Sequence, residues 1–218
     1  MRKFVSSFGK PDDKKAIIAV GISLAIGAVA VGLINLGMGM LGWTLVTLNN
    51  LRLFMQLHDM AHFSFFSNMR ANIFIGKMIG IYTHFPFNAW RDGHNHHHKH
   101  FGNLDRLDLS QTILFTKQQY DQMKGVKKML VRFFREPILY FTFSVPFAWF
   151  VGVFYLVVKR YGVFSMTFLE KTLSVVIYTC LLPMIGIPAW KIWLSIYCSS
   201  IIGNILFHLQ HSVNLPYR

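Results

Sequence analysis

Histidine is the residue whose number and spacing stand out in this chain. The 218 residues include ten histidines, and five of them fall between 94 and 100. His58 and His62 stand at i, i+4, which places both imidazoles on one face of a helix. His94, His97 and His98 stand at i, i+3 and i+4 and share a face in the same way. Because neutral imidazole is a natural ligand of iron, zinc and copper, these two groups predict a metal site.

A third histidine group, His208 and His211, lies at the end of the last apolar run. The chain has no His-Glu-x-x-His motif of a zinc protease and no Glu-x-x-His pairs of a carboxylate-bridged di-iron bundle. The acids inside the first two groups are Asp59 and Asp92. We therefore expect an all-nitrogen site, and so many candidate imidazoles favour two metal ions over one.

Each group also has a simpler interpretation. His58 and His62 alone could be two hydrogen-bonded histidines, and residues 94–100 alone could be an adventitious metal-binding tract or a solvated loop of a transporter. Both groups, however, lie just outside apolar segments and on the same predicted face of a membrane. That combination favours a shared site.

The elements that carry these histidines are predicted from composition. Hydrophobic residues make up 53% of the chain and charged residues only 14%, against about a quarter in soluble domains. The 22 Lys and Arg against 9 acids give 22 − 9 = +13. Uncharged stretches such as 16–51 separate the basic residues, so they form no continuous patch for nucleic acid. The chain is predicted to be an all-α integral membrane protein, with no nucleic-acid partner.

Residues 16–51 carry no charge and are too long for one crossing, so we expect a helical hairpin. The break is predicted near Asn35-Leu36-Gly37, and the second helix to run to about Leu57. Five N-terminal Lys and Arg place the start of the chain in the cytosol by the positive-inside rule. Two crossings then return the chain to the cytosol at His58.

The later chain is predicted to contain a broken, interfacial or re-entrant segment at 71–87 and a polar cytosolic segment at 88–137. Three apolar runs follow, at 138–158, 172–190 and 192–211. Three full crossings would carry the third histidine group to the opposite face from the first two. We therefore expect about four crossings in total, with 172–190 and its two prolines as the run that does not cross.

The two histidine groups resemble the boxes of the membrane fatty acid desaturase family. Residues 58–66 match His-Asp-x-x-His-x-Ser-Phe-Phe. Residues 90–98 match Trp-Arg-x-x-His-x-x-His-His, and the family's Gly-Asn-Leu-Asp tail follows at 102–105. The resemblance covers the chain from about Leu57 onward and implies a single desaturase-like domain over 1–218. The family places a further His-x-x-His-His box beyond His211, so we expect the domain to be C-terminally incomplete.

The resemblance also implies the ligands. Histidines of the two boxes would bind two non-haem irons at the cytosolic membrane face, and these are His58, His62, His94, His97 and His98. In the third group, His211 is favoured as a ligand and His208 is the second choice. His96 and His100 fall at positions that the motif leaves free, where they would support the ligands from outside or lie in solvent. Asp59 and Asp92 are expected to orient ligand imidazoles through the second ring nitrogen.

The implied activity is oxygen-dependent removal of two hydrogens from adjacent methylenes of a fatty acyl lipid. An external electron donor of the ferredoxin or cytochrome b5 type would be required. The basic segment 117–135 is a candidate docking face for an acidic donor or a contact with anionic membrane lipid. The alternatives are a hydroxylase of the same superfamily, a metal transporter, which would need ionisable residues in mid-membrane, and a noncatalytic remnant that keeps the histidines.

Overall fold

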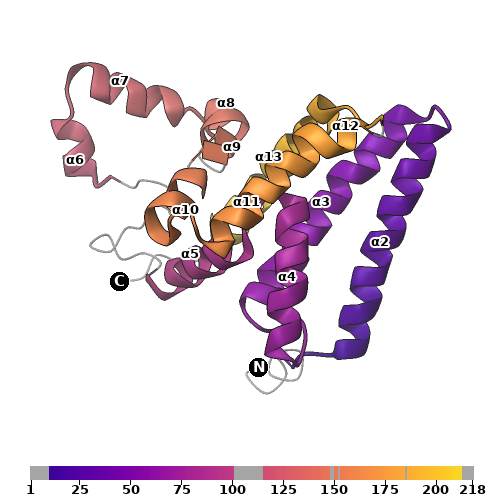
Figure 1. Cartoon of the computed structure of the whole chain (residues 1–218). Coiled ribbons are helices and arrows are strands. Elements are labelled where there is room, and N and C mark those ends of the chain that lie inside the picture. The colour runs from indigo at the N-terminus through magenta and orange to yellow at the C-terminus, as the bar shows by residue number, and fades with distance from the viewer. Residues whose placement is uncertain (1–9, 101–114, 148–149, 152, 185, 213–218) are drawn as a thin grey trace.

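The computed structural model describes residues 10–100, 115–147, 150–151, 153–184 and 186–212. These residues form helices and no strand, which confirms the predicted all-α class. Figure 1 shows the elements in chain order. They are α2 (Asp13–Asn35), α3 (Gly39–Ala61), α4 (Met69–Thr83), α5 (Phe87–His100), α6 (Lys117–Gln122), α7 (Gly125–Phe134), α8 (Pro137–Leu139), π-helix η2 (Tyr140–Ser144), α9 (Val145–Phe147), α10 (Val153–Tyr161), α11 (Met166–Val176), π-helix η4 (Ile177–Leu181), α12 (Leu182–Met184) and α13 (Ala189–Ser212).

The first two helices, α2 and α3, form the predicted hairpin and pack along one another (Figure 1). Their turn contains Gly37, whose φ of 81° is one that glycine adopts without strain. Close to the turn, a Cβ on Gly42 would lie 2.6 Å from Cγ1 of Ile34, so a side chain there would push the helices apart. The predicted break is confirmed. Helix α3 continues past Leu57 to Ala61, so it carries the first histidine box itself.

Helix α4 turns sharply into α5, the helix of the second box. At 15 residues, α4 is shorter than the roughly 20 residues that a crossing needs. It ends at His84, which has a left-handed φ of 67°, and the Phe85 N–H then donates to the Gly80 carbonyl at 2.8 Å. Helix α5 begins at Phe87. The interfacial or re-entrant character of 71–87 stays a prediction.

One of the later apolar runs differs from expectation. Segment 138–158, expected as one crossing, is helical at each of its described residues, including α8, η2, α9 and α10, and residues 148–149 and 152 lie outside the described residues. Segment 172–184 is continuous helix in spite of Pro183. A proline ring crowds the preceding helical turn, and the wider π turn η4 immediately before Pro183 accommodates it. Helices α11, η4 and α12 thus form one helix. The number of crossings stays a prediction.

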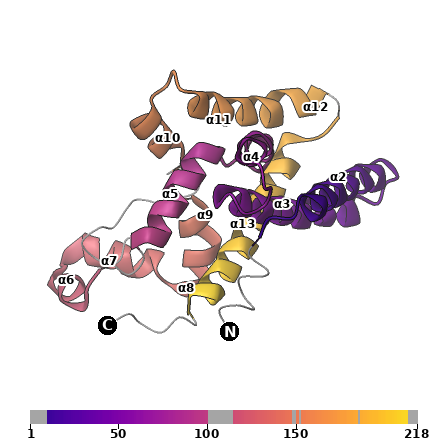
Figure 2. The same ribbon diagram turned by 90° about the horizontal axis from the view of Figure 1, so that it is seen from below.

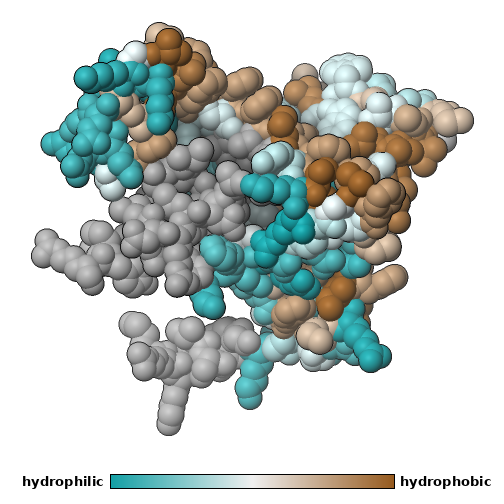
Figure 3. Space-filling model, turned by 60° about the vertical axis from the view of Figure 1, so that its left-hand side comes forward, coloured by the Kyte–Doolittle hydropathy of each residue, from teal (hydrophilic) through white to brown (hydrophobic). Residues whose placement is uncertain are grey.

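Three helices of the described chain are long and apolar enough to cross a membrane, and they are Asp13–Asn35, Met166–Met184 and Ala189–Leu209. Large apolar side chains on them face outward, and Leu24 on α2, for example, is 69% exposed. Hydrophobic side chains cover broad regions of the surface visible in Figure 3. Outward apolar surface of this extent is typical of helices that face lipid rather than water.

Helix α3 is the central element, and it packs against α2, α4, α5 and α13. Near its end, Leu57, Met60 and Ala61 are completely buried in one core together with Phe87 from the start of α5. Seen from below, α6 and α7 lie at the edge of the molecule farthest from α2 (Figure 2). Because the ends of α3 and α5 share a core, the two histidine boxes are brought to the same place.

Candidate metal centre

The first histidine box occupies the C-terminal end of α3. His58 lies in the last turn and His62 is the C-cap residue, so the i, i+4 spacing places both rings on one side, with centroids 4.8 Å apart. The chain then leaves the helix through Phe63, which has a positive φ of 54°. Ser64 closes this end, because its N–H and its Oγ both donate to the Asp59 carbonyl.

The second box lies on α5. His94 and His98 stand one helical turn apart, with ring centroids 4.4 Å apart. The indole of Trp90 stacks on the His94 ring at 4.8 Å and an interplanar angle of 15°. Asn95 Nδ2 donates to the Ala61 carbonyl at 3.2 Å, which ties α5 to the end of α3. One box is therefore fastened to the helix that carries the other.

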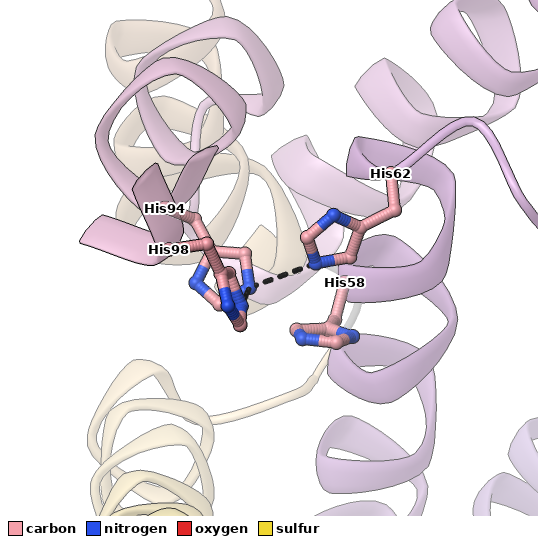
Figure 4. Close-up of side chains that lie close together, drawn as sticks. All are labelled: His58, His62, His94 and His98. Atoms are coloured by element: carbon pink, nitrogen blue, oxygen red, sulfur yellow. Dashed lines mark hydrogen bonds between the residues drawn. The ribbon is translucent and has the colours of Figure 1, made fainter. Parts of the chain in front are cut away.

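Four histidines converge between these two helices. Ligand nitrogens of His58, His62, His94 and His98 all lie within 4.8 Å of one another. The Nε2 atom of His94 lies 3.1 Å from Nε2 of His62 and 3.0 Å from Nε2 of His98. Figure 4 shows the rings of α3 and α5 facing one another. His94 is buried at the centre, and His62 and His98 are exposed at the edge of the cluster.

This donor set fits a transition-metal ion. Imidazole nitrogen suits iron, copper and zinc, and four such nitrogens within 4.8 Å of one another could serve as ligands to one ion. Partial desolvation of His62 beside the other rings, followed by the nearby His58, lowers the pKa of His62, which favours the neutral form that binds metal. A second metal ion would need further ligands beyond these four.

The two acids of the boxes differ in what they contact. The Asp59 carboxylate lies 3.0 Å from Nδ1 of His58, which leaves Nε2 of that ring for a metal. The Asp92 carboxylate instead accepts a 2.6 Å hydrogen bond from the Tyr161 hydroxyl and pairs with Arg91 at 2.8 Å. Burial, followed by this bond to Asp92, raises the pKa of Tyr161. Among the described residues, Asp92 thus anchors α5 to α10 and contacts no box histidine.

We expect Asp59→Asn to weaken metal binding by about 10- to 100-fold. The neutral amide lacks the negative charge with which the carboxylate orients the His58 ring at Nδ1. Equilibrium dialysis of the purified chain with Co²⁺ measures this affinity. Asp121→Asn, at an exposed acid on α6, is the matched control and should leave it unchanged. Equal affinity in Asp59→Asn and the unmodified chain would contradict the role of Asp59.

The third histidine group lies on α13. His208 is exposed and packs edge-on against the Phe141 ring at 5.2 Å, outside the four-histidine cluster. The side chain of His211 lies outside the described residues. Phe207, which precedes His208 on α13, nevertheless reaches the site, because its ring centroid lies 5.9 Å from that of His58. Ligation by either histidine of this group stays a prediction.

Three further expected histidines lie on α5. His96 is half-buried, and the side chains of His97 and His100 lie outside the described residues. Ligation by His97 and the supporting roles of the other two therefore stay predictions.

Sequence reasoning missed Asn95, Tyr161 and Phe207 as parts of the site. Asn95 lies inside the second box, but its spacing alone assigns it no partner. Tyr161 and Phe207 are distant in sequence from the residues that they contact, so only tertiary structure reveals them. A small, mainly apolar cavity beside the site is lined in part by Phe54, Phe207 and Phe85.

Comparison with known proteins agrees with this arrangement. The family model described as "Fatty acid desaturase" matches residues 35–218, so the chain belongs to the fatty acid desaturase family. Together with the three apolar helices, this membership supports an integral membrane protein. No solved structure shows a significant match to the chain.

Several curated proteins are similar over part of the chain. A fatty acid desaturase of Bacillus subtilis (strain 168) is 32% identical over 90 residues, which are 41% of this chain and 26% of the relative. An endoplasmic-reticulum omega-3 fatty acid desaturase of Vigna radiata var. radiata is 30% identical over 44% of this chain and 23% of the relative. An sn-1 acyl-lipid omega-3 desaturase (ferredoxin) of Synechocystis sp. is 33% identical over 40% and 24%. The matched part is thus about a quarter of each relative.

Proposed function

We propose that this chain acts in lipid metabolism as an oxygen-dependent desaturase that introduces a double bond into a fatty acyl lipid. The observation that carries the proposal is the convergence of four histidines from α3 and α5 on one point. Membership of the desaturase family supports the reaction class. The boxes are proposed to face the cytosol, as the positive-inside rule predicts.

The proposed ligands to two non-haem irons are His58, His62, His94, His97 and His98, with His211 or His208 from α13. When bound, the irons supply the oxygen chemistry that removes hydrogen from an unactivated C–H bond. The side chains of the protein hold the ligand rings in place. Asp59 holds the His58 ring by its second nitrogen. Trp90 covers the buried face of His94 and excludes water from that side.

The acyl chain is proposed to enter the cavity beside the site. Phe207 contacts both the His58 ring and Phe54, so this aromatic pair lies between the cavity and the histidines. Asn50 and Thr83 lie on the cavity wall as well. Apolar walls of this kind would exclude water and, with the acyl chain bound, place particular carbons near the metal site.

Electrons are proposed to come from an external donor of the ferredoxin or cytochrome b5 type. One relative carries ferredoxin in its name.

In the basic segment 117–135, helix α7 has an apolar face and a basic face. The exposed apolar side chains are Val126, Met129, Leu130 and Phe133. The basic side chains on the other side include Lys128, Arg132 and Arg135. This two-faced pattern favours contact of the apolar face with membrane lipid, and it leaves the basic face for an acidic donor.

We expect replacement of Met129 and Phe133 by serine to release α7 from lipid, because burial of each side chain contributes about 2 kcal/mol. A fluorophore on a cysteine at Leu130, with the native cysteines replaced, should emit at longer wavelength in vesicles after the double substitution. Lys128→Ser, on the opposite face beside Tyr120, is the control and should leave the emission unchanged. An unchanged emission in the double variant would place α7 away from lipid.

The decisive experiment measures iron and product together. Protein made under iron-replete conditions should contain about two irons per chain, as an all-imidazole binuclear site would. Analysis of host lipids should then show new double bonds. Hydroxylated lipids would instead indicate the hydroxylase, and iron-free protein without product would indicate a noncatalytic remnant.

A further inference from the structure

A buried polar face of α11 lies against the turn between α4 and α5. Glu170, Lys171 and Ser174 are 5%, 2% and 1% exposed, although their helix is apolar enough to cross a membrane. Burial of charged side chains in such a helix is expensive, and they are retained mainly where they have a specific task. None of the three is part of the metal cluster in the described chain.

Two of these residues hold the end of α4. Lys171 Nζ donates to the His84 carbonyl at 3.0 Å. Ser174 Oγ donates to the Ile81 carbonyl at 2.7 Å and lies 2.9 Å from Nδ1 of His84. Because a hydroxyl has one hydrogen to donate, the second contact has Nδ1–H of His84 donating to Ser174. Burial, and then Lys171, lowers the pKa of His84 to about 2, so this ring is neutral.

The third residue, Glu170, ties α11 to α4 beside the start of α5. The Glu170 carboxylate pairs with Lys77 of α4 at 3.2 Å. It also faces the backbone N–H of Phe87, the first residue of α5. A carboxylate at a helix N-terminus is favourable because of the free N–H groups and the helix dipole there. One side chain therefore links α11 to α4 and places its carboxylate near the start of α5.

The other side of the turn rests on two glycines of α4. A Cβ on Gly76 would lie 2.5 Å from the Phe87 ring, and one on Gly80 would lie 2.4 Å from the Phe85 carbonyl oxygen. The turn is thus enclosed between bare backbone of α4 and the polar face of α11. From Phe87 to His94 is two helical turns, about 10 Å, so the orientation fixed at the turn decides where the second box lies.

We propose that Glu170, Lys171 and Ser174 are positioning residues that set the angle of α5 relative to α3, and so the fit of the second histidine box to the first. The effect on metal binding rests on the proposed function, whereas the effect on the helix angle does not. Apolar side chains of similar volume would fill the same space and are often as stable as a buried charge. These polar contacts differ from apolar packing in that they hold particular backbone atoms of the turn.

The test compares Lys171→Met with Asn49→Leu, each of which removes a buried nitrogen that donates to a carbonyl of a neighbouring helix. Asn49 of α3 donates to the Ser23 carbonyl of α2 at 3.0 Å, so its hydrogen bond lies within the first hairpin rather than at the α4–α5 turn. Spin labels on cysteines at Met40 of α3 and Lys99 of α5 report the helix angle by pulsed EPR. Cys180 and Cys198 are replaced first. The label distances are measured on the whole chain in detergent without metal. Co²⁺ is then added, and its binding to the same chain is measured.

Lys171→Met should shift or broaden the distribution of label distances, weaken Co²⁺ binding by at least about tenfold and change the Co²⁺ absorption bands. Asn49→Leu should do none of these. A Lys171→Met distribution identical to that of the unmodified chain would overturn the proposal. If Lys171→Met does not fold, the label distances of Ser174→Ala are compared with those of the unmodified chain and of Asn49→Leu in the same way, and an unchanged distribution would again overturn the proposal. An unmodified chain that binds no Co²⁺ would refute the metal site, while the label distances would still decide the positioning role.

Discussion

His94→Ala should abolish metal binding, with affinity for Co²⁺ or Fe²⁺ reduced by more than about 100-fold, beyond the usual cost of losing a supporting residue. His94 is the central member of the cluster, because its Nε2 lies within hydrogen-bond distance of Nε2 of both His62 and His98. Its side chain is also buried, with 8% of its surface exposed. Its loss therefore leaves a buried cavity in which water cannot replace the imidazole ligand with the same geometry. Metal analysis of purified protein and equilibrium dialysis measure the effect.

Lys99→Ala provides the matched control for this prediction. Lys99 is an exposed side chain on the same helix, next to His98, and we expect its removal to leave metal content unchanged. A His94→Ala chain that still binds metal with the affinity of the control would show that the cluster is not the binding site. Loss of binding in both variants would point to general damage to α5.

Gly80→Ala should destabilise the fold by about 1–3 kcal/mol or more, as overpacking does. The added Cβ would lie 2.4 Å from the Phe85 carbonyl oxygen and 3.1 Å from the Phe87 nitrogen. Both are backbone atoms, so the start of α5 must move to make room. We expect a lower thermal midpoint in detergent and, because the second box moves with α5, weaker Co²⁺ binding.

Gly32→Ala is the control for the glycine substitution. Gly32 lies on α2 with no atom within 4 Å of its added Cβ, so alanine should be neutral or raise stability by up to about 1 kcal/mol through helix propensity. Equal thermal midpoints for Gly80→Ala and Gly32→Ala would mean that the α4–α5 turn is more adaptable than its close packing indicates.

The pairing of histidines within each of the first two boxes was predictable because it depends on local periodicity. An i, i+4 pair shares a helix face wherever the helix lies, so His58 with His62 and His94 with His98 form pairs in any helical fold. Their mutual approach was predicted from the side of the membrane on which each pair falls. The hairpin of α2 and α3 followed from an uncharged stretch too long for one crossing.

Other features depend on contacts that spacing does not encode. Glu170 and Lys171 look like an ordinary charged pair beside an apolar run, and only the packing of α11 on the turn at His84 gives them partners. Pro183 suggested a broken helix because its ring cannot fit a regular α turn. The π turn before it removes that conflict, and a single sequence carries little signal for such a turn.

The stacked pair of Trp90 and His94 gives the site an intrinsic optical signal. The indole lies 4.8 Å from the imidazole and nearly parallel to it, so a metal ion bound to His94 changes the electronic surroundings of Trp90 directly. The chain has five tryptophans, and those elsewhere would supply a constant background. Occupancy of the centre can therefore be followed by the emission of the protein itself, in the membrane and without a chemical label.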